Sequence, residues 1–265
     1  MLARVMGRVI IKWGGGLITD KSTICTPRHE QMQKLAKTVR ILIELGHSVV
    51  VVHGAGSFGH LRAREARINE GRIQDLNQDE AIMQIRSDMD QLNLYVADSL
   101  INQGLIVKNH PPRTFVINNG PRFIADLERF HAPNCVHITF GDVVRCDDDR
   151  EFAILSGDDL MHRLSTELPD VTHAIFALGD VPGLMSAPPD VANAELIPVW
   201  NSTNLIEGTH ASDIDVTGGI FLKANRASAI ASTVNQVWFV DGRIPSRILE
   251  IVSDGTTIGT RITSE

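Results

Sequence analysis

The 265-residue sequence is poor in cysteine, has no long apolar run and carries no excess of positive charge. Its three cysteines, Cys25, Cys135 and Cys146, are odd in number and share no Cys-x-x-Cys spacing. This argues against a disulfide framework or a zinc site, and a reducing cytoplasmic setting is expected. No window reaches the roughly 18 apolar residues that a membrane span needs. The first dozen residues are too short and too interrupted for a signal peptide.

The formal net charge of −7 argues against a general nucleic-acid binder. A hydrophobic content of 43% with 22% charged residues is ordinary for a soluble globular protein, so a packed core is expected. A chain of this length forms one large α/β domain or two lobes. There is no internal repeat and no low-complexity linker.

Apolar runs alternate with helical patterns, which indicates a mainly parallel sheet covered by helices on both faces. The expected strands cover 8–13, 48–52, 105–108, 136–140, 173–178, 236–240 and 257–262. Residues 143–155 are expected to form a hairpin with a polar turn. In sheets of this kind, ligands bind at the carboxyl ends of the strands.

Caps and helical periodicity mark the expected helices. One should begin with Thr26 as its N-cap and Pro27 at its first position, and end at Gly46. A long helix over 78–103 is expected after Asn77 as its cap. Two more should lie near 158–168 and 222–234. The polar stretch 62–80 and the Pro-rich stretch 182–201 are expected to be loops, and a boundary between two lobes would fall near 155–175.

The strand over 48–52 opens into a glycine loop bracketed by His53 and His60. Glycines let backbone N–H groups close on an anion, so phosphate is the first ligand to consider. The loop also fits Gly-x-Gly-x-x-Gly, but a dinucleotide site needs a second strand ending in an acidic residue about 20 positions further on. Residues 61–80 hold no such strand, so that alternative is disfavoured. A metal site on the two histidines lacks a matching third ligand.

Lysines accompany two further glycine motifs. Lys12 ends an apolar strand just before Gly14–Gly16, and an ammonium buried there needs an anionic partner. Lys21 follows, although a snorkelling surface lysine explains it equally well. Lys223 stands at the start of a helix after Asp215-Val216-Thr217-Gly218-Gly219, where small residues permit close approach of a polyphosphate.

Carboxylates lie beside the remaining glycine turns. Ser156-Gly157-Asp158-Asp159 fits a helix start, with Ser156 as the cap. Asp158, Asp159 and Asp142 are alternatively placed to orient lysines or to approach a hydrated Mg²⁺. Gly179-Asp180-Val181-Pro182-Gly183 follows another apolar strand and is either a plain turn or part of a nucleotide site.

Together these motifs resemble the amino acid kinase superfamily and, within it, the isopentenyl phosphate kinase family. The resembling segments are Lys12–Gly16, Thr19–Ser22, His53–His60, Gly141–Val143, Ser156–Asp159, Gly179–Gly183, and Asp215–Gly219 with Lys223. The chain departs from the family pattern in Gly16 (usually serine), in Ala55 (usually glycine) and in the 179–183 motif, which lacks a threonine and an aspartate.

The resemblance implies an α/β fold, a three-layer αβα sandwich with a mostly parallel central sheet of eight strands. It implies a single amino acid kinase domain over 1–265, with an acceptor-binding lobe over about 1–170 and a nucleotide-binding lobe over about 171–265. A cytoplasmic homodimer is expected, with a small-molecule phosphate acceptor as its partner and neither nucleic acid nor membrane.

The implied reaction transfers a phosphoryl group from ATP to isopentenyl phosphate, with Mg²⁺ carried mainly by the ATP and no metal site on the protein itself. The implied catalytic residues are Lys12, Lys21, His60 and Asp158. The implied acceptor-binding residues are Ala55, Gly56, Ser57, Gly59, His60 and Gly157. The implied ATP-binding residues are Lys12, Gly14, Gly15, Gly16, Gly56, Gly179, Asp180, Gly183, Gly218 and Lys223.

Two alternatives stay open at this point. One is a kinase of the same fold that acts on a phosphonate such as fosfomycin, a small carboxylate or another monophosphate. The other is a non-catalytic nucleotide- or metabolite-sensing module, which the set of lysines disfavours. An isoprenoid acceptor also needs an apolar pocket, and the helix over 78–103 offers Ile82, Met83, Ile85, Met89 and Tyr95, although such a stripe is usually core.

Overall fold

The computed structural model describes residues 6–188, 191, 193–201 and 219–264, without the side chains of 219–222. Within these residues the main sheet has eight strands in the order β10-β12-β11-β9-β1-β2-β6-β3. Their bounds are Arg8–Trp13 (β1), Ser48–His53 (β2), Val107–Asn109 (β3), Val136–Phe140 (β6), Val171–Leu178 (β9), Val199–Trp200 (β10), Gln236–Asp241 (β11) and Gly259–Ile262 (β12). All neighbouring strands run parallel except β11 and β12. The expected mostly parallel sheet is confirmed.

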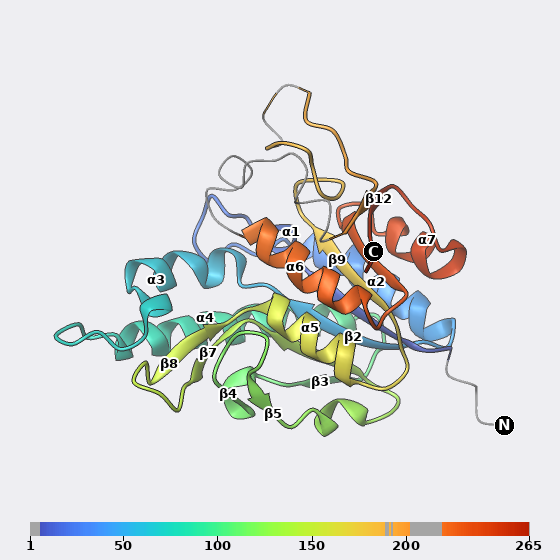
Figure 1. The fold of residues 1–265 in the computed structure, drawn as a ribbon. Helices are drawn as coiled ribbons and strands as arrows, with labels where there is room; N and C mark the ends of the chain where they lie inside the picture. Colours follow the sequence, from blue (N-terminus) through green and yellow to red (C-terminus); the bar gives the residue numbers. More distant parts are fainter. Residues whose placement is uncertain (1–5, 189–190, 192, 202–218, 265) are drawn as a thin grey trace.

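Helices cover both faces of this sheet. On one face lie α2 (His29–Glu44), α4 (Asp79–Ile101) and α7 (Ser246–Asp254), which share one hydrophobic core with alternate residues of β1 such as Val9 and Ile11. On the other lie α5 (Gly157–Glu167) and α6 (Gly219–Ala231), next to each other in Figure 1 and packed with Ile10 of the same strand. Because successive strand residues point to opposite faces, one strand supplies both cores. The three-layer αβα sandwich is confirmed.

The predicted hairpin is confirmed as β7 (Asp142–Arg145) and β8 (Phe152–Leu155). It belongs to a second, four-stranded sheet of order β5-β4-β7-β8, which the sequence did not reveal. The short strands β4 (Val116–Ile117) and β5 (Ile124–Ala125) complete it. Because β7 begins right after β6 ends, the hairpin rises from the carboxyl edge of the main sheet. The residue before β7 and the residue after β8 therefore meet at the place where ligands are expected.

The polar stretch 62–80 is more structured than a loop. It contains most of α3 (His60–Glu65) and the 3₁₀ turn η2 (Ile68–Glu70). The fully buried side chain of Gln78 organises it, donating from Nε2 to the carbonyls of Ala66 and Gly71 at 3.1 Å each and accepting from the amide of Ile73 at 3.0 Å. A buried amide satisfied on both sides fixes the backbone around it. The Pro-rich stretch 182–201 is described in part and contains β10.

Some element ends differ from expectation. The prediction of Thr26 and Pro27 as the start of a helix is wrong, because Pro27 forms a β-bridge with Thr19 and α2 begins only at His29. The end is as expected, since Gly46 follows the last helical turn with φ of +89°. The long helix starts at Asp79 after Gln78 rather than after Asn77. Helix α7 was not predicted at all.

The remaining short elements lie in the connections. They are α1 (Gly15–Ile18), η1 (Gly56–Phe58), η3 (Pro112–Thr114) and η4 (Glu128–His131). Two of them, α1 and η1, directly follow the ends of β1 and β2. Among the described helices, none is long and apolar enough to cross a membrane.

Candidate active site

The glycine motifs meet at the carboxyl edge of three adjacent strands. Strands β9, β1 and β2 are neighbours in the sheet, so the loops that follow them lie side by side. A Cβ on Gly54 would stand only 2.7 Å from the amide nitrogen of Gly15, and Gly56 adopts a φ of +51°. A Cβ on Gly179 would likewise collide with the backbone of Gly16. The loops therefore pack backbone against backbone, which side chains would prevent.

Lys12 is the buried cation predicted for this edge. It lies near the end of β1 and is only 6% exposed, and its Nζ is 2.5 Å from Oδ1 of Asp158. A Cβ on Gly157 would lie 3.2 Å from the Lys12 Cε, so the glycine leaves room for the lysine stem below the first turn of α5. Burial lowers the pKa of Lys12, and the carboxylate of Asp158 counteracts that effect.

Asp158 links two lysines. Its Oδ2 lies 3.7 Å from Nζ of Lys223 on α6, while its Oδ1 holds Lys12. Burial raises the pKa of a carboxyl group, but the two lysines outweigh that effect and hold the pKa of Asp158 below its usual value. The expected helix start is confirmed, because Ser156 caps α5 and its Oγ accepts from the amide of Asp159 at 3.0 Å. The cap fixes where Asp158 projects.

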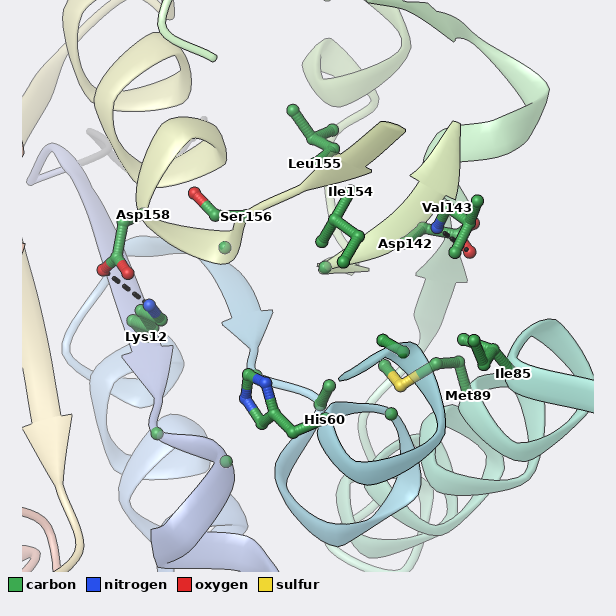
Figure 2. Close-up of a pocket in the computed structure, with 18 of the residues that line it drawn as sticks. Lys12, His60, Ile85, Met89, Asp142, Val143, Ile154, Leu155, Ser156 and Asp158 are labelled. Atoms are coloured by element: carbon green, nitrogen blue, oxygen red, sulfur yellow. Dashed lines mark hydrogen bonds and ion pairs between the residues drawn. The ribbon is translucent and has the colours of Figure 1, made fainter. Parts of the chain in front are cut away.

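A pocket of about 180 Å³ opens beside this ion pair. Figure 2 shows Lys12 and Asp158 on one side of it and Met89, Ile85 and Val143 on the other. Near Lys12 and Asp158 the lining includes Gly14, Gly15, Ser156, Gly157 and Lys223, and Gly54, Ala55, Gly59, His60 and Gly141 complete the polar and small lining residues, whereas Asp142 lies beside Val143 on the opposite side (Figure 2). The apolar end is lined by Ala63, Ile85, Met89, Val143, Ile154 and Leu155. The pocket thus suits a ligand with an anionic head and a short apolar tail.

His60 stands between the two ends, at the first position of α3, and points into the pocket (Figure 2). Desolvation lowers the pKa of its imidazole, and the charges of Lys223, Lys12 and Lys21 lower it further. Three lysines therefore act electrostatically at one histidine. This concentration of positive charge attracts an anion, and the imidazole presents an N–H donor to it.

Lys21 lies beside the glycine loop instead of lining the pocket. Its Nζ is 2.9 Å from the position that a Cβ on Gly16 would take, and 3.7 Å from Oδ2 of Asp180. The side chains of Lys21 and Asp180 are 65% and 69% exposed. An ion pair so open to solvent contributes little stability, so the Lys21 side chain is only weakly held in this position.

Besides Lys21, six predicted site residues of the described part do not line the pocket: Gly16, Gly56, Ser57, Gly179, Asp180 and Gly183. Ser57 is buried, its amide donates to Oγ1 of Thr19 at 3.0 Å and its Oγ accepts from the amide of Thr26, so both groups hold the segment before α2. Gly56 belongs to the same tight turn. Gly183 packs against Thr260 of β12. Gly218 lies outside the described residues.

Two other titratable groups singled out by their motifs are held in the fold by protein partners. His53 is fully buried, stacks on Phe140 and has its pKa lowered by burial to about 4. Asp142 accepts from the Arg113 guanidinium at 3.0 Å. Burial nevertheless raises its pKa. The described residues contain no group of three His, Cys, Asp or Glu side chains able to hold a metal ion.

Sequence reasoning missed part of the lining. Ala63, Ile154 and Leu155 lie outside the motifs, whereas Gly54, Gly141, Asp142, Val143 and Ser156 belong to the motifs but were not assigned to a binding set. Several had a usable signal, because Ala63 is one helical turn from His60, and Ile154 and Leu155 directly precede the capped start of α5. Of the helix stripe expected to form an apolar pocket, Ile85 and Met89 line it, while Met83 is 64% exposed.

Comparisons with known proteins agree with this geometry. The model of the amino acid kinase family matches residues 7–241. The chain therefore belongs to the amino acid kinase family. An isopentenyl phosphate kinase from Thermoplasma acidophilum is 33% identical over 257 residues, which cover 96% of this chain and 99% of that protein.

Solved structures give the same picture. An X-ray structure of isopentenyl phosphate kinase has a TM-score of 0.83 at 25% identity, covering 97% of this chain and 100% of that one. The product complex of the T. acidophilum isopentenyl phosphate kinase has a TM-score of 0.78 at 27% identity, covering 96% and 99% of the two chains. These likenesses extend over both halves of the chain.

Proposed function

We propose that this chain catalyses the ATP-dependent phosphorylation of isopentenyl phosphate to isopentenyl diphosphate. The observation that carries the proposal is the pocket itself, which joins a cationic end at Lys12, Lys223 and His60 to an apolar end at Ile85 and Met89. A small polar acceptor such as an amino acid has no apolar group to contact the apolar end. A five-carbon prenyl phosphate uses both ends, and the relatives named above carry the same activity in their names.

His60 and the surrounding backbone amides form the proposed acceptor-phosphate site. A monophosphate ester is mostly dianionic at neutral pH because its second pKa is about 6. The imidazole of His60 is placed to donate to such a dianion, helped by amides near Ala55 and Gly157, which also line the pocket. Gly59 lines the pocket too, but its own amide donates to the carbonyl of Gly56. Ile85, Met89 and Ile154 are then left to contact the apolar tail. Gly56 and Ser57 act indirectly here, by shaping the turn.

The transfer step needs charge neutralisation more than a base. An oxygen of the acceptor phosphate attacks the γ-phosphorus of ATP, the bond from that phosphorus to the bridging oxygen breaks, and ADP leaves with the bonding electron pair. The attacking oxygen is already anionic, so no proton has to be removed. Lys12 and Lys21 stabilise the transferred group, Lys223 neutralises the ATP phosphates, and Asp158 orients Lys12 and Lys223.

The described residues fit ATP at the cationic end. Gly15 and Gly16 open α1 close to Lys12, so their amides have no partner within that helix, whereas the amide of Gly14 donates to the carbonyl of Ala177 at 3.0 Å. Gly179 and Asp180 lie at the end of the neighbouring strand β9. We assign Gly183 and Gly218 to the nucleotide side by resemblance alone. Asp158 and Asp159 are both engaged by cations, so Mg²⁺ is expected on the ATP phosphates, where it would neutralise negative charge.

The larger organisation follows from the same proposal. Residues up to about 170 would bind the acceptor and residues from about 171 the nucleotide, within one domain over 1–265. The pocket agrees with this division, since its apolar lining comes from α3, α4, β7 and β8, whereas Lys223 comes from α6. The homodimer implied by the family resemblance stays a prediction.

A coupled assay for ADP release tests the function. ATP and Mg²⁺ are supplied with isopentenyl phosphate, dimethylallyl phosphate or fosfomycin in parallel, and the product is identified by mass. We expect turnover with the two prenyl phosphates and little with fosfomycin, which leaves most of the apolar end without contacts. Turnover with fosfomycin alone would contradict the proposed acceptor, and turnover with none of the three would reject it.

A further inference from the structure

Helices α5 and α6 are joined by a second ion pair behind the first. Nε of Arg226 lies 2.7 Å from Oδ1 of Asp159, and their side chains are 21% and 6% exposed. Oδ2 of the same carboxylate accepts from Oγ of Ser156 at 2.8 Å, so Asp159 is held from two sides. Neither Arg226 nor Asp159 lines the pocket. The Arg226 guanidinium therefore ties α6 to the first turn of α5.

The two ion pairs between these helices run side by side. Asp158 and Asp159 are neighbours in the first turn of α5, and Lys223 and Arg226 are three residues apart on α6, a spacing that puts both on one helix face. The pair of Arg226 and Asp159 is the shorter, at 2.7 Å against 3.7 Å for Lys223 and Asp158. The Arg226–Asp159 pair therefore sets the distance between α5 and α6, and the Lys223 side chain extends across the remaining gap towards Asp158.

We propose that Arg226 is a positioning residue, which through Asp159 holds α6 against α5 so that Lys223 reaches Asp158 and the cationic end of the pocket. This inference rests on the proposed phosphoryl transfer. Lysine has a long, flexible stem and makes no directional fork, so its place depends on where its helix stands. Misplacement of a catalytic group by about 1 Å can cost on the order of a hundredfold in rate.

Arg226→Gln tests the proposal because it removes the guanidinium and keeps a polar side chain of moderate size. We expect kcat to fall about 10- to 100-fold. The KM of the acceptor should stay within about twofold, because the residues proposed to contact it most closely, His60, Ile85 and Met89, lie on α3 and α4. Arg163→Gln is the matched control, since Arg163 is an equally buried arginine of α5 (16% exposed side chain) paired with Glu167 away from the pocket. The control should keep its kcat.

A double-mutant cycle separates positioning from general stability. If the pair acts as a unit, Asp159→Asn combined with Arg226→Gln lowers kcat no further than either change alone. Arg226→Lys restores the charge at the same place and should recover part of the lost kcat, and it also serves if Arg226→Gln fails to fold. Additive losses in the cycle, or a kcat unchanged in both Arg226 variants, would overturn the inference.

A calorimetric measurement of ADP binding in the presence of Mg²⁺ tests the role of Arg226 without requiring turnover. It therefore separates a failure of this inference from a failure of the proposed function. We expect Arg226→Gln to weaken ADP binding about tenfold through the displaced Lys223. If the wild-type chain binds ADP but phosphorylates no prenyl phosphate, the acceptor proposal fails while the ADP affinities still support or overturn the role of Arg226. If the wild type turns over normally and Arg226→Gln matches it in kcat and in ADP affinity, only the positioning role is wrong.

Discussion

Lys12 and Lys21 are both proposed to stabilise the transferred phosphoryl group, yet the fold holds them in opposite ways. Lys12 is buried in β1 and paired with Asp158 at 2.5 Å, so its charge is part of the folded core of the site. Removing it leaves a buried carboxylate with Lys223 as its remaining lysine neighbour, which costs stability as well as activity. A lower kcat in a Lys12 variant would therefore not show whether the lysine acts in catalysis or only stabilises the fold.

Lys21 makes that separation possible. Its side chain is 65% exposed and its pair with Asp180 is long, so Lys21→Met should leave the free energy of unfolding within about 0.5 kcal/mol of wild type. If Lys21 contacts the transferred group, kcat should still fall by about two to three orders of magnitude, as for other charges on a transition state. Steady-state kinetics and urea unfolding of the same sample check both values. A near-normal kcat would remove Lys21 from the catalytic set.

His60 offers a prediction about binding. A hydrogen bond to a charged group contributes about 1.5–3 kcal/mol, so His60→Ala should raise the KM of isopentenyl phosphate about 10- to 100-fold. The KM of ATP should change much less, because the imidazole stands between the ion pair and the apolar end. Initial rates with each substrate varied in turn measure the split. Equal rises in both values would mean that the variant disturbs the whole pocket.

At the scale of elements, strands and long helices could be predicted, while segments fixed by tertiary contacts could not. The four apolar residues among the six of Arg8–Trp13 predict β1 because the sheet buries both of its faces. The prediction of a helix start at Thr26 and Pro27 was wrong because the β-bridge between Pro27 and Thr19 overrides the local capping signal. Helix α7 did have signals, with Pro245 before it and Gly255, at φ of +71°, after it, but its nine residues were not recognised.

The candidate site, too, could be predicted only in part. Its polar end could be predicted because lysines and glycines at strand ends carry a local chemical reason. The apolar end could not, since Val143, Ile154 and Leu155 look like ordinary hairpin residues, and only the second sheet brings them to the pocket. Met83 and Tyr95 lie on the predicted helix but elsewhere, Met83 exposed and Tyr95 packed on His29 at 4.8 Å.

Helix α4 therefore carries a prediction on acceptor length. Ile85 and Met89, one turn apart, close the apolar end of the pocket. Ile85→Ala removes three carbons there, so the ratio of kcat/KM for geranyl phosphate to that for isopentenyl phosphate should rise about tenfold or more, since each methylene is worth about 1–3 kcal/mol. Met83→Ala, on the exposed face of the same helix, is the control and should leave the ratio unchanged. A ratio that moves equally in both variants would place the tail elsewhere.

At the scale of the whole molecule, the order of strands explains how segments far apart in the sequence form one pocket. The adjacent strands β9, β1 and β2 deliver the loops near residues 179, 14 and 54 to one edge. The start of α5 lies over that edge, and α6 brings Lys223 beside it. Because β1 lies between β2 and β9, Lys12 stands where the two proposed halves meet.

The same buried architecture makes the folded chain sensitive to acid. Burial lowers the pKa of His53, and likewise those of His110 and His173, from 6.5 to about 4. Above pH 6.5 these imidazoles are neutral in both states and their burial carries no proton-linked cost. Below pH 6.5 these three histidines take up protons in the unfolded chain, whereas in the folded chain they stay neutral down to about pH 4. The free energy of unfolding therefore falls as the pH falls from 6.5 to about 4. Fully buried His53 alone contributes about 1.4 kcal/mol per pH unit there.

Urea unfolding between pH 7 and pH 4.5 tests this linkage. We expect the wild-type free energy of unfolding to fall by several kcal/mol, on the order of one proton per buried imidazole. His53→Gln should lower stability at pH 7 and make the decline with pH shallower by about one proton. Asp158 loses its charge only below this window, because the lysines hold its pKa under 3.8, whereas burial raises the pKa of Asp142. A slope that His53→Gln does not alter would mean that His53 is protonated in the folded chain well above pH 4.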